Sequence, residues 1–202
     1  MSCKLVGGTP VAVKVGNSCG RGETCKSTKG IGSCRRKEIC SCGRSSPNVF
    51  KTFDGKIINF SGKCRYLLSS FSDTSPRGTC SYSVDVMNKG TGDTYIIVNV
   101  LDMDIRFLKN KIVKINGQPR TLPAGGSKFI IYNAGFEIRL YVPSCGILIG
   151  WDGTSNVVIS VPTFFSSGLD GICGNCNGDR RDDPTNVDVY SKYATMKGSN
   201  TR

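Results

Sequence analysis

Eleven cysteines in 202 residues constrain the fold of this chain more than any other feature of its sequence. Thiols in such number are rare in the reducing cytosol, so a disulfide framework formed in an oxidising compartment explains them better. Zinc is the weaker explanation, because the chain has no histidine and only Cys173 and Cys176 have C-x-x-C spacing. Because eleven is odd, at least one cysteine is free, bonded to another chain or paired outside this segment. The sequence therefore predicts a secreted protein.

The cysteines divide the chain into parts of different character. Six of them lie in residues 1–42, a stretch rich in Gly, Ser and Lys and poor in large apolar side chains: Cys3, Cys19, Cys25, Cys34, Cys40 and Cys42. Such a segment cannot close a hydrophobic core unaided. We predict a cystine-rich lead-in over residues 1–41, a β domain over residues 42–190 and a flexible tail over residues 191–202. Little apolar content follows Pro184, so we expect fraying from that point.

The central part is patterned as a series of hairpins. Asp54-Gly55 separates two apolar-rich runs and favours a type I′ turn, in which both central residues need positive φ. Similar turn signals follow at Asn116-Gly117, Asn133-Ala134-Gly135 and Asp152-Gly153, and Thr94–Leu108 alternates as a long β-rich stretch. No window has helical periodicity. The sequence predicts an all-β fold, an antiparallel β-sandwich or open barrel built of hairpins.

The net charge of +12 favours polyanionic partners such as sulfated glycans, acidic mucins or anionic surfaces. Nucleic acid is a poorer match, because the basic residues are scattered and the longest runs are Arg35-Arg36-Lys37 and Arg180-Arg181. No apolar run reaches the roughly 18 residues that a membrane helix needs. The first residues are not a signal peptide, which suggests a mature fragment or an excerpt of a longer secreted protein.

The segment Gly171–Asp183 carries the side chains that suggest chemistry. Oxygen-bearing residues stand at nearly alternate positions around a glycine: Asn175, Asn177, Asp179, Asp182 and Asp183. Calcium takes six to eight such oxygens, and a loop of this pattern can wrap it. The position-12 glutamate and the flanking helices of an EF-hand are missing. The alternative is a polar turn whose Asn and Asp side chains cap their own backbone.

Two motifs in this order resemble the opening and close of a von Willebrand factor type D domain. The opening is Thr52-Phe53-Asp54-Gly55 followed by Phe60–Leu68, which matches F-x-G-x-C-x-Y-x-L. The close is Gly168–Gly178 followed by Asp182-Asp183, which is similar to G-L-C-G-N-x-N-G and then D-D. The resemblance covers about residues 42–190. Two departures are Asp170, where the family often has cysteine, and Ser45–Asn48, which replaces G-D-P-H.

The resemblance implies a calcium site at this closing segment. By motif position its ligands are Asp54, Asn175, Asn177, Asp182, Asp183 and the main-chain oxygen of Asp179. It also implies a disulfide between Cys42 and Cys173, which would tie the start of the domain to its end. Beside that pair we expect Cys80–Cys145 and Cys64–Cys176, which leaves five cysteines of the lead-in over.

Two further motifs have competing interpretations. Cys173-Gly-Asn-Cys176 has the spacing of a thiol oxidoreductase, but no helix start follows to lower a thiol pKa, so we expect two separate structural bridges. Asn59-Phe60-Ser61 is an N-glycosylation sequon, and the extracellular context predicts a glycan at Asn59 if that side chain points outward from its strand.

The favoured function is a calcium-binding structural or adhesive module of a larger secreted protein, acting on other extracellular proteins or acidic glycans, with homotypic or disulfide-linked assembly. The alternatives are a growth-factor-binding regulator, a luciferase-like enzyme on the same scaffold and a lipid-transport role. Catalysis is disfavoured, because without histidine there is no Ser-His-Asp or Cys-His machinery.

Overall fold

The computed structural model describes residues 38–46, 48–59, 61–72, 80–88 and 94–195. In the first 37 residues it describes only the backbone of four strands, which pair as two antiparallel hairpins: β1 (Lys4–Val6) with β2 (Thr9–Val11), and β3 (Glu23–Thr28) with β4 (Ile31–Arg36). Cys3 and Cys19 lie outside the described residues. Cys25 and Cys34 are register partners in the second hairpin, and their side chains lie outside the description.

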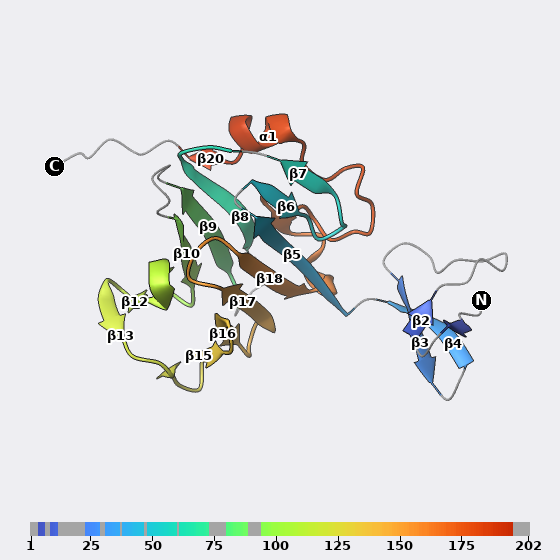
Figure 1. Cartoon of the computed structure of the whole chain (residues 1–202), viewed down its shortest axis with the longest axis horizontal. Helices are drawn as coiled ribbons and strands as arrows, with labels where there is room; N and C mark the ends of the chain where they lie inside the picture. Colours follow the sequence, from blue (N-terminus) through green and yellow to red (C-terminus); the bar gives the residue numbers. More distant parts are fainter. Residues whose placement is uncertain are drawn as a thin grey trace.

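Two antiparallel sheets of eight strands each make up the body of the domain (Figure 1). The first sheet contains β14 (Ala124–Gly125), β15 (Ile130–Ala134), β16 (Glu137–Val142), β17 (Ile147–Trp151), β18 (Val157–Pro162), β5 (Ile39–Ser46), β6 (Val49–Lys51) and β7 (Ile57–Asn59), in that order. The second contains β13 (Gln118–Arg120), β12 (Val113–Ile115), β11 (Met103–Phe107), β10 (Thr94–Val100), β9 (Tyr82–Asn88), β8 (Arg65–Phe71) and β19 (Leu169–Asp170), with β20 (Ala194–Thr195) also pairing with β8. The predicted all-β sandwich is confirmed.

Alternate residues of both sheets fill one shared core. On β16, for example, Ile138 and Leu140 are fully buried while Arg139 between them faces outward, as the two-residue period of a strand requires. Trp151 joins the layers most directly: its side chain is fully buried, and its indole N–H donates to the main-chain oxygen of Leu108, 2.9 Å away. Two 3-10 turns, η1 (Lys109–Lys111) and η2 (Thr163–Phe165), complete the connections.

The hairpin turns follow the sequence signals in part. Asn116-Gly117 has positive φ at both residues (50° and 80°), as a type I′ turn requires. The type I′ prediction at Asp54-Gly55 is wrong, because the connection from β6 to β7 spans residues 52–56 and only Gly55 has positive φ. Leu101-Asp102 forms a tight turn with both φ positive inside the stretch that we expected to be continuous. Leucine is atypical of such a conformation, and no glycine or asparagine marks the turn, which hid it from the sequence.

The chain after Pro184 does not fray as predicted. A short helix, α1 (Asn186–Ser191), begins with a capping box between Thr185 and Asp188, which satisfies free N–H groups of its first turn. Val189 of α1 is fully buried, and Tyr193 just beyond is also buried. β20 then pairs with β8, so ordered structure crosses the predicted boundary at residue 190 and reaches Thr195. Residues 196–202 lie outside the described part of the chain.

Candidate cation site at the closing loop

The candidate site is formed where the connection from β6 to β7 meets residues 171–183, here called the closing loop. Main-chain hydrogen bonds hold the two together: the N–H of Phe53 donates to the oxygen of Cys173 at 2.9 Å. The closing loop also pairs with β8, because the N–H groups of Ile172 and Cys173 donate to Leu67 and Leu68. The site therefore stands on main-chain contacts with both sheets.

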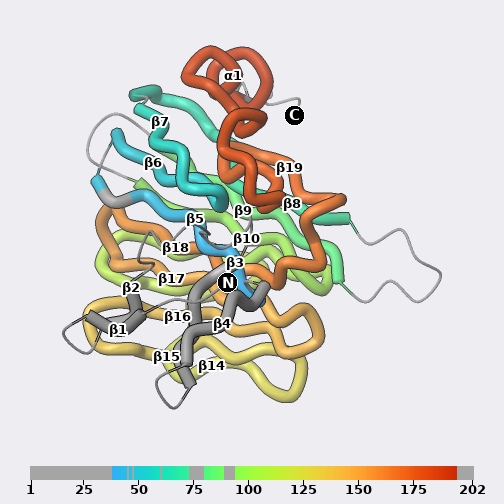
Figure 2. Tube along the Cα trace, turned by 90° about the vertical axis from the view of Figure 1, so that its right-hand side faces the viewer, coloured from blue at the N-terminus to red at the C-terminus, as the bar shows by residue number. Residues whose placement is uncertain are grey.

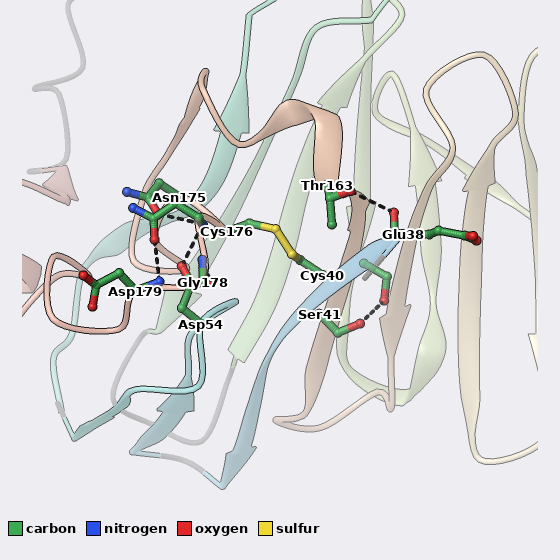
Figure 3. Close-up of a disulfide and its surroundings, with 11 residues drawn as sticks. Glu38, Cys40, Ser41, Asp54, Thr163, Asn175, Cys176, Gly178 and Asp179 are labelled. Carbon is green, nitrogen blue, oxygen red and sulfur yellow. Dashed lines mark hydrogen bonds between the residues drawn. A yellow bond between two sulfur atoms is a disulfide. The ribbon is translucent and has the colours of Figure 1, made fainter. Parts of the chain in front are cut away.

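Two disulfides fasten the closing loop to β5. Cys42 bonds to Cys173, as expected, and Cys40 bonds to Cys176 (Figure 3). The expected Cys64–Cys176 pair is wrong. Cys40 and Cys42 stand two residues apart on one strand, so both side chains point inward to the same place, where both half-cystines of the loop meet them. The predicted separation of the C-x-x-C cysteines into two structural bridges is confirmed.

The remaining described cysteines also have clear positions. Cys80 and Cys145 form the expected third bridge, which joins the segment just before β9 to the connection between β16 and β17. Cys64, just before β8, is partly buried and has no disulfide partner among the described residues. The spacing of Cys40 and Cys42 was the sequence signal for the missed pair, because a C-x-C on a strand places both thiols on one face.

Asp54 points at the closing loop, as the resemblance implied. Its carboxylate accepts hydrogen bonds from the main-chain N–H of Gly178 at 2.7 Å and of Asn177 at 3.1 Å (Figure 3). Asp54 is thus a residue of the β6–β7 turn whose carboxylate binds the main chain of the closing loop, and its role as a cation ligand stays a prediction.

Asn175, Asn177 and Asp182 form a cluster of their own. Both side-chain amides donate to the same oxygen of Asp182, and the side-chain oxygen of each asparagine accepts from a main-chain N–H two residues on. Those local bonds are the ones that the polar-turn interpretation predicts. A half-turn of either amide exchanges its nitrogen for its oxygen and presents an oxygen ligand toward Asp182. The arrangement is therefore compatible with both interpretations.

Asp179 has a different side-chain role. Its carboxylate forms an ion pair with Arg181 at 2.7 Å on the protein surface. Its side chain is thereby occupied, which agrees with the implied role of its main-chain oxygen alone.

Asp183 is the most unusual residue of the site. Only 3% of it is exposed, and one carboxylate oxygen, Oδ2, accepts from the hydroxyl of Thr52 at 2.5 Å. The other, Oδ1, is buried without a hydrogen-bond partner among the described residues. Burial raises its pKa to about 6, and the nearby charges of Asp54 and Asp182 add to that rise, whereas the hydrogen bond from Thr52 and the positive charge of Lys56 oppose it. An ionised carboxylate in this place needs a positive partner, or else it takes up a proton.

The surroundings of Asp183 are shaped around its carboxylate. Gly174 has φ of 77°, and any Cβ there would collide with Oδ1 of Asp183, so this position requires glycine on both counts. Lys56 donates to the main-chain oxygen of Asp183 at 2.6 Å. Thr52 and Lys56 were missed by the sequence analysis, since neither residue type signals such a role without the fold.

The donor set fits a hard cation. Every predicted ligand supplies oxygen, and Asp183 Oδ1 is a buried acceptor that a cation would satisfy. Within the described ranges no three His, Cys, Asp or Glu side chains form a ready-made metal cluster. Asparagine and main-chain oxygens would therefore have to complete the coordination, as in the predicted ligand set.

Comparison with known proteins decides the family. The von Willebrand factor type D domain profile matches residues 42–188. This chain belongs to the von Willebrand factor type D family. The match begins at Cys42, within β5, and covers most of the paired sheets, the closing loop and the first half of α1, so it includes every predicted ligand of the candidate site.

Several curated relatives share the type D domain. IgGFc-binding protein of Homo sapiens is 26% identical over 185 residues, which are 90% of this chain and 3% of that protein. Zonadhesin of Sus scrofa is 28% identical over 174 residues, 82% of this chain and 7% of that protein. Alpha-tectorin of Gallus gallus is 26% identical over 186 residues, 89% of this chain and 8% of that protein. The chain thus spans less than a tenth of each relative.

These relatives are extracellular adhesive or matrix proteins, which supports an extracellular adhesive module here. The disulfide-rich type D domain is consistent with that compartment. No helix in the described part of the chain is long and apolar enough to cross a membrane.

Proposed function

We propose that this type D domain is a calcium-binding structural module of a secreted adhesive protein. The observation that carries the proposal is the buried oxygen of Asp183, which has no partner among the described residues and stands close to Asp54 and Asp182. Calcium bound there would neutralise three carboxylates that now repel one another. Its ligands would be Asp54, Asn175, Asn177, Asp182, Asp183 and the main-chain oxygen of Asp179.

The role of the ion in this proposal is structural. Its ligands come from the β6–β7 turn and the closing loop, which lie more than a hundred residues apart in the sequence. A bound ion would therefore cross-link the beginning and the end of the domain, parallel to the two disulfides. A module stiffened in this way transmits force between its neighbours in a longer chain, which is the requirement of an adhesive or matrix protein.

The test is the melting temperature of the oxidised protein in millimolar calcium and in chelator. Ligand at about a hundred times Kd adds roughly 2.7 kcal/mol to the free energy of unfolding. For a domain of this size that stabilisation raises the melting temperature by about 5–11 °C. Asp183→Asn should abolish the rise, because it removes the buried charge and keeps the shape.

Asp102→Asn is the matched control for this experiment. It removes the same charge from the turn between β10 and β11, where positive φ favours asparagine. The calcium shift should survive in this variant. An equal shift in the wild type and in Asp183→Asn would refute the proposed site.

The proposal extends to the partners and to the surface of the module. We expect it to contact other extracellular proteins or acidic glycans and to assemble with copies of itself or through a disulfide at an unpaired cysteine. Asn59 is exposed at the end of β7, which supports a glycan there. A loss of mass on treatment of the secreted protein with an N-glycosidase, absent in Asn59→Gln, tests that part.

A further inference from the structure

The end of the domain farthest from the closing loop carries a concentration of positive charge. No Asp or Glu occurs between Asp104 and Glu137, whereas six basic residues do: Arg106, Lys109, Lys111, Lys114, Arg120 and Lys128. Asp104 and Glu137 at its borders are engaged with Arg106 and Arg139. The segment from 109 to 129, here called the basic arm, is therefore positive along its whole length.

The fold of the basic arm turns this charge into a site. The chain leaves the second sheet at its edge strand β13 and enters the first sheet at its edge strand β14, and it crosses between the sheets at residues 121–123. Figure 1 shows β13 and β15, and Figure 2 shows β14 and β15, at the end of the domain opposite α1. A cavity of about 590 Å³ opens at this crossover, a size in the range of small-ligand sites.

The walls of the cavity differ in chemistry. Arg120, at the end of β13, and Lys128, at the tip of the turn between β14 and β15, stand on its rim, and neither has an ion-pair partner within the described residues. Thr121 and Ser127 add hydroxyl groups, and Pro123 and Phe129 add apolar surface.

The turn that carries Lys128 is rigidly defined. The N–H of Gly126 donates to the oxygen of Phe129 at 2.8 Å, which places Ser127 and Lys128 at the tip. Gly125 has φ of 129°, and a Cβ there would collide with the same oxygen of Phe129, so only glycine lets the turn close. The position of Lys128 relative to Arg120 is thus set by the backbone and not by a long free loop.

We propose that this cavity binds an anionic saccharide unit. Two cations on the rim would hold a sulfate or carboxylate, the hydroxyls would bond to sugar hydroxyls, and the apolar floor would pack against the face of the ring. A neutral sugar has no negative charge to pair with the two cations. Nucleic acid bases stack on aromatic side chains, and this cavity does not offer a pair of them. The inference deepens the proposed extracellular function, on which it rests, but it does not depend on the cation site.

The experiment measures the affinity of the full chain for four probes: a heparin hexasaccharide, a hyaluronan hexasaccharide, a neutral chitin hexasaccharide and a single-stranded DNA oligonucleotide. The variants are Arg120→Ala/Lys128→Ala and the control Lys51→Ala/Lys63→Ala. Both pairs remove two exposed positive charges, but the control pair lies near β6 and β8, away from the basic arm. Each measurement is made in calcium and in chelator.

The arm variant should bind the anionic saccharides at least about tenfold more weakly, as expected for the loss of charge-assisted contacts, and the control should change about threefold or less. Selective binding of heparin would identify sulfate as the anionic group, and binding of hyaluronan would identify carboxylate. Equal weakening by both variant pairs would overturn the inference. The same holds if the chain binds the DNA oligonucleotide or the neutral chitin hexasaccharide as tightly as it binds the anionic saccharides.

The calcium-dependent rise in melting temperature is recorded for each variant in the same series. A normal rise in the arm variant shows that it is folded. If the folded arm variant binds the saccharides as tightly as the wild type does, that result counts against the saccharide site in the basic arm and not against the calcium site. Absence of the rise in the wild type would count against the proposed calcium site alone, since saccharide binding in chelator still tests the arm.

Discussion

The closing loop and the basic arm lie at opposite ends of the domain. They differ in how their charges are arranged and in how each segment is held in place. In the closing loop three carboxylates lie close together, and one of them is buried. In the basic arm the charges stand apart and are exposed or partly exposed, so water screens them. Two disulfides fasten the loop, whereas no disulfide among described residues falls within the arm. In this domain disulfides hold the segment with concentrated like charge, whereas main-chain pairing and turn geometry hold the segment with dispersed like charge.

The largest expected effect comes from removing the two bridges that distinguish the two regions. The variant Cys40→Ala/Cys42→Ala/Cys173→Ala/Cys176→Ala opens disulfides that span 136 and 131 residues. Because both close nearly the same loop, the chain-entropy model assigns the two together about 5 kcal/mol and not twice that value. Cys176 stands between two predicted ligands, so calcium affinity should fall as well. Denaturant unfolding and a calcium titration measure the two effects.

The Cys80–Cys145 bridge provides the control for that comparison. It spans 65 residues and should contribute about 4 kcal/mol. Its removal should leave calcium affinity unchanged, because neither cysteine belongs to the closing loop or to the β6–β7 turn. If this variant and the one without the closing-loop bridges lower calcium affinity alike, the local role of those two bridges is wrong.

The next largest effect concerns the support beneath the arm. Trp151→Ala removes a fully buried side chain and its hydrogen bond to Leu108, just before the arm begins. Such truncations cost about 3–5 kcal/mol. Urea unfolding measures the loss. Val187→Ala, at a site that is 73% exposed, should change stability by less than about 0.5 kcal/mol; similar losses in both variants would contradict the assigned role of Trp151.

A smaller effect is expected at the turn that shapes the arm. Gly117 has φ of 80° and open space around it, so Gly117→Ala tests backbone conformation without a steric clash. The left-handed region costs a residue with a Cβ roughly 1–2 kcal/mol. Gly126 also has open space but no positive φ, and Gly126→Ala should therefore be close to neutral in thermal unfolding. If Gly117→Ala leaves the free energy of unfolding unchanged, a side chain at this position does not strain the turn.

The smallest effect is expected at the helix that follows the closing loop. Thr185→Ala removes the N-cap of α1 and should cost about 1 kcal/mol. Hydrogen bonds from the N–H and hydroxyl of Thr185 lower the pKa of Asp188. A lowered pKa means that this contribution is present above the usual aspartate range and is lost as pH falls through the folded value. Thermal unfolding below about pH 4 should therefore separate the wild type from Thr185→Ala less than at pH 7.

Much of the fold was predictable because its signals are local. Alternating apolar residues and Asn-Gly or Gly-containing turns gave the sheets, since both depend on neighbours in the sequence. The Leu101-Asp102 turn and the structured segment after Pro184 were not predictable in this way. The first begins with a leucine in a conformation that leucine disfavours, and the second is held by tertiary contacts, such as the burial of Val189 and the pairing of β20 with β8.

The candidate site was predictable only as far as its motifs extend. The family motifs placed Asp54 opposite the closing loop and paired Cys42 with Cys173, and the structure agrees. The Cys40–Cys176 bridge was missed because the family motif specifies a cysteine at neither position. Thr52 and Lys56 became visible only when the fold brought them to Asp183, because a threonine and a lysine on a turn have many uses.

Direct calorimetric titration of calcium into the chelator-treated full chain tests the central claim most closely. We predict saturable binding of one ion per chain in the wild type, in Asp102→Asn and in Arg120→Ala/Lys128→Ala, with no binding heat in Asp183→Asn. Absence of saturable binding in the wild type, or an unchanged isotherm in Asp183→Asn, would contradict the account.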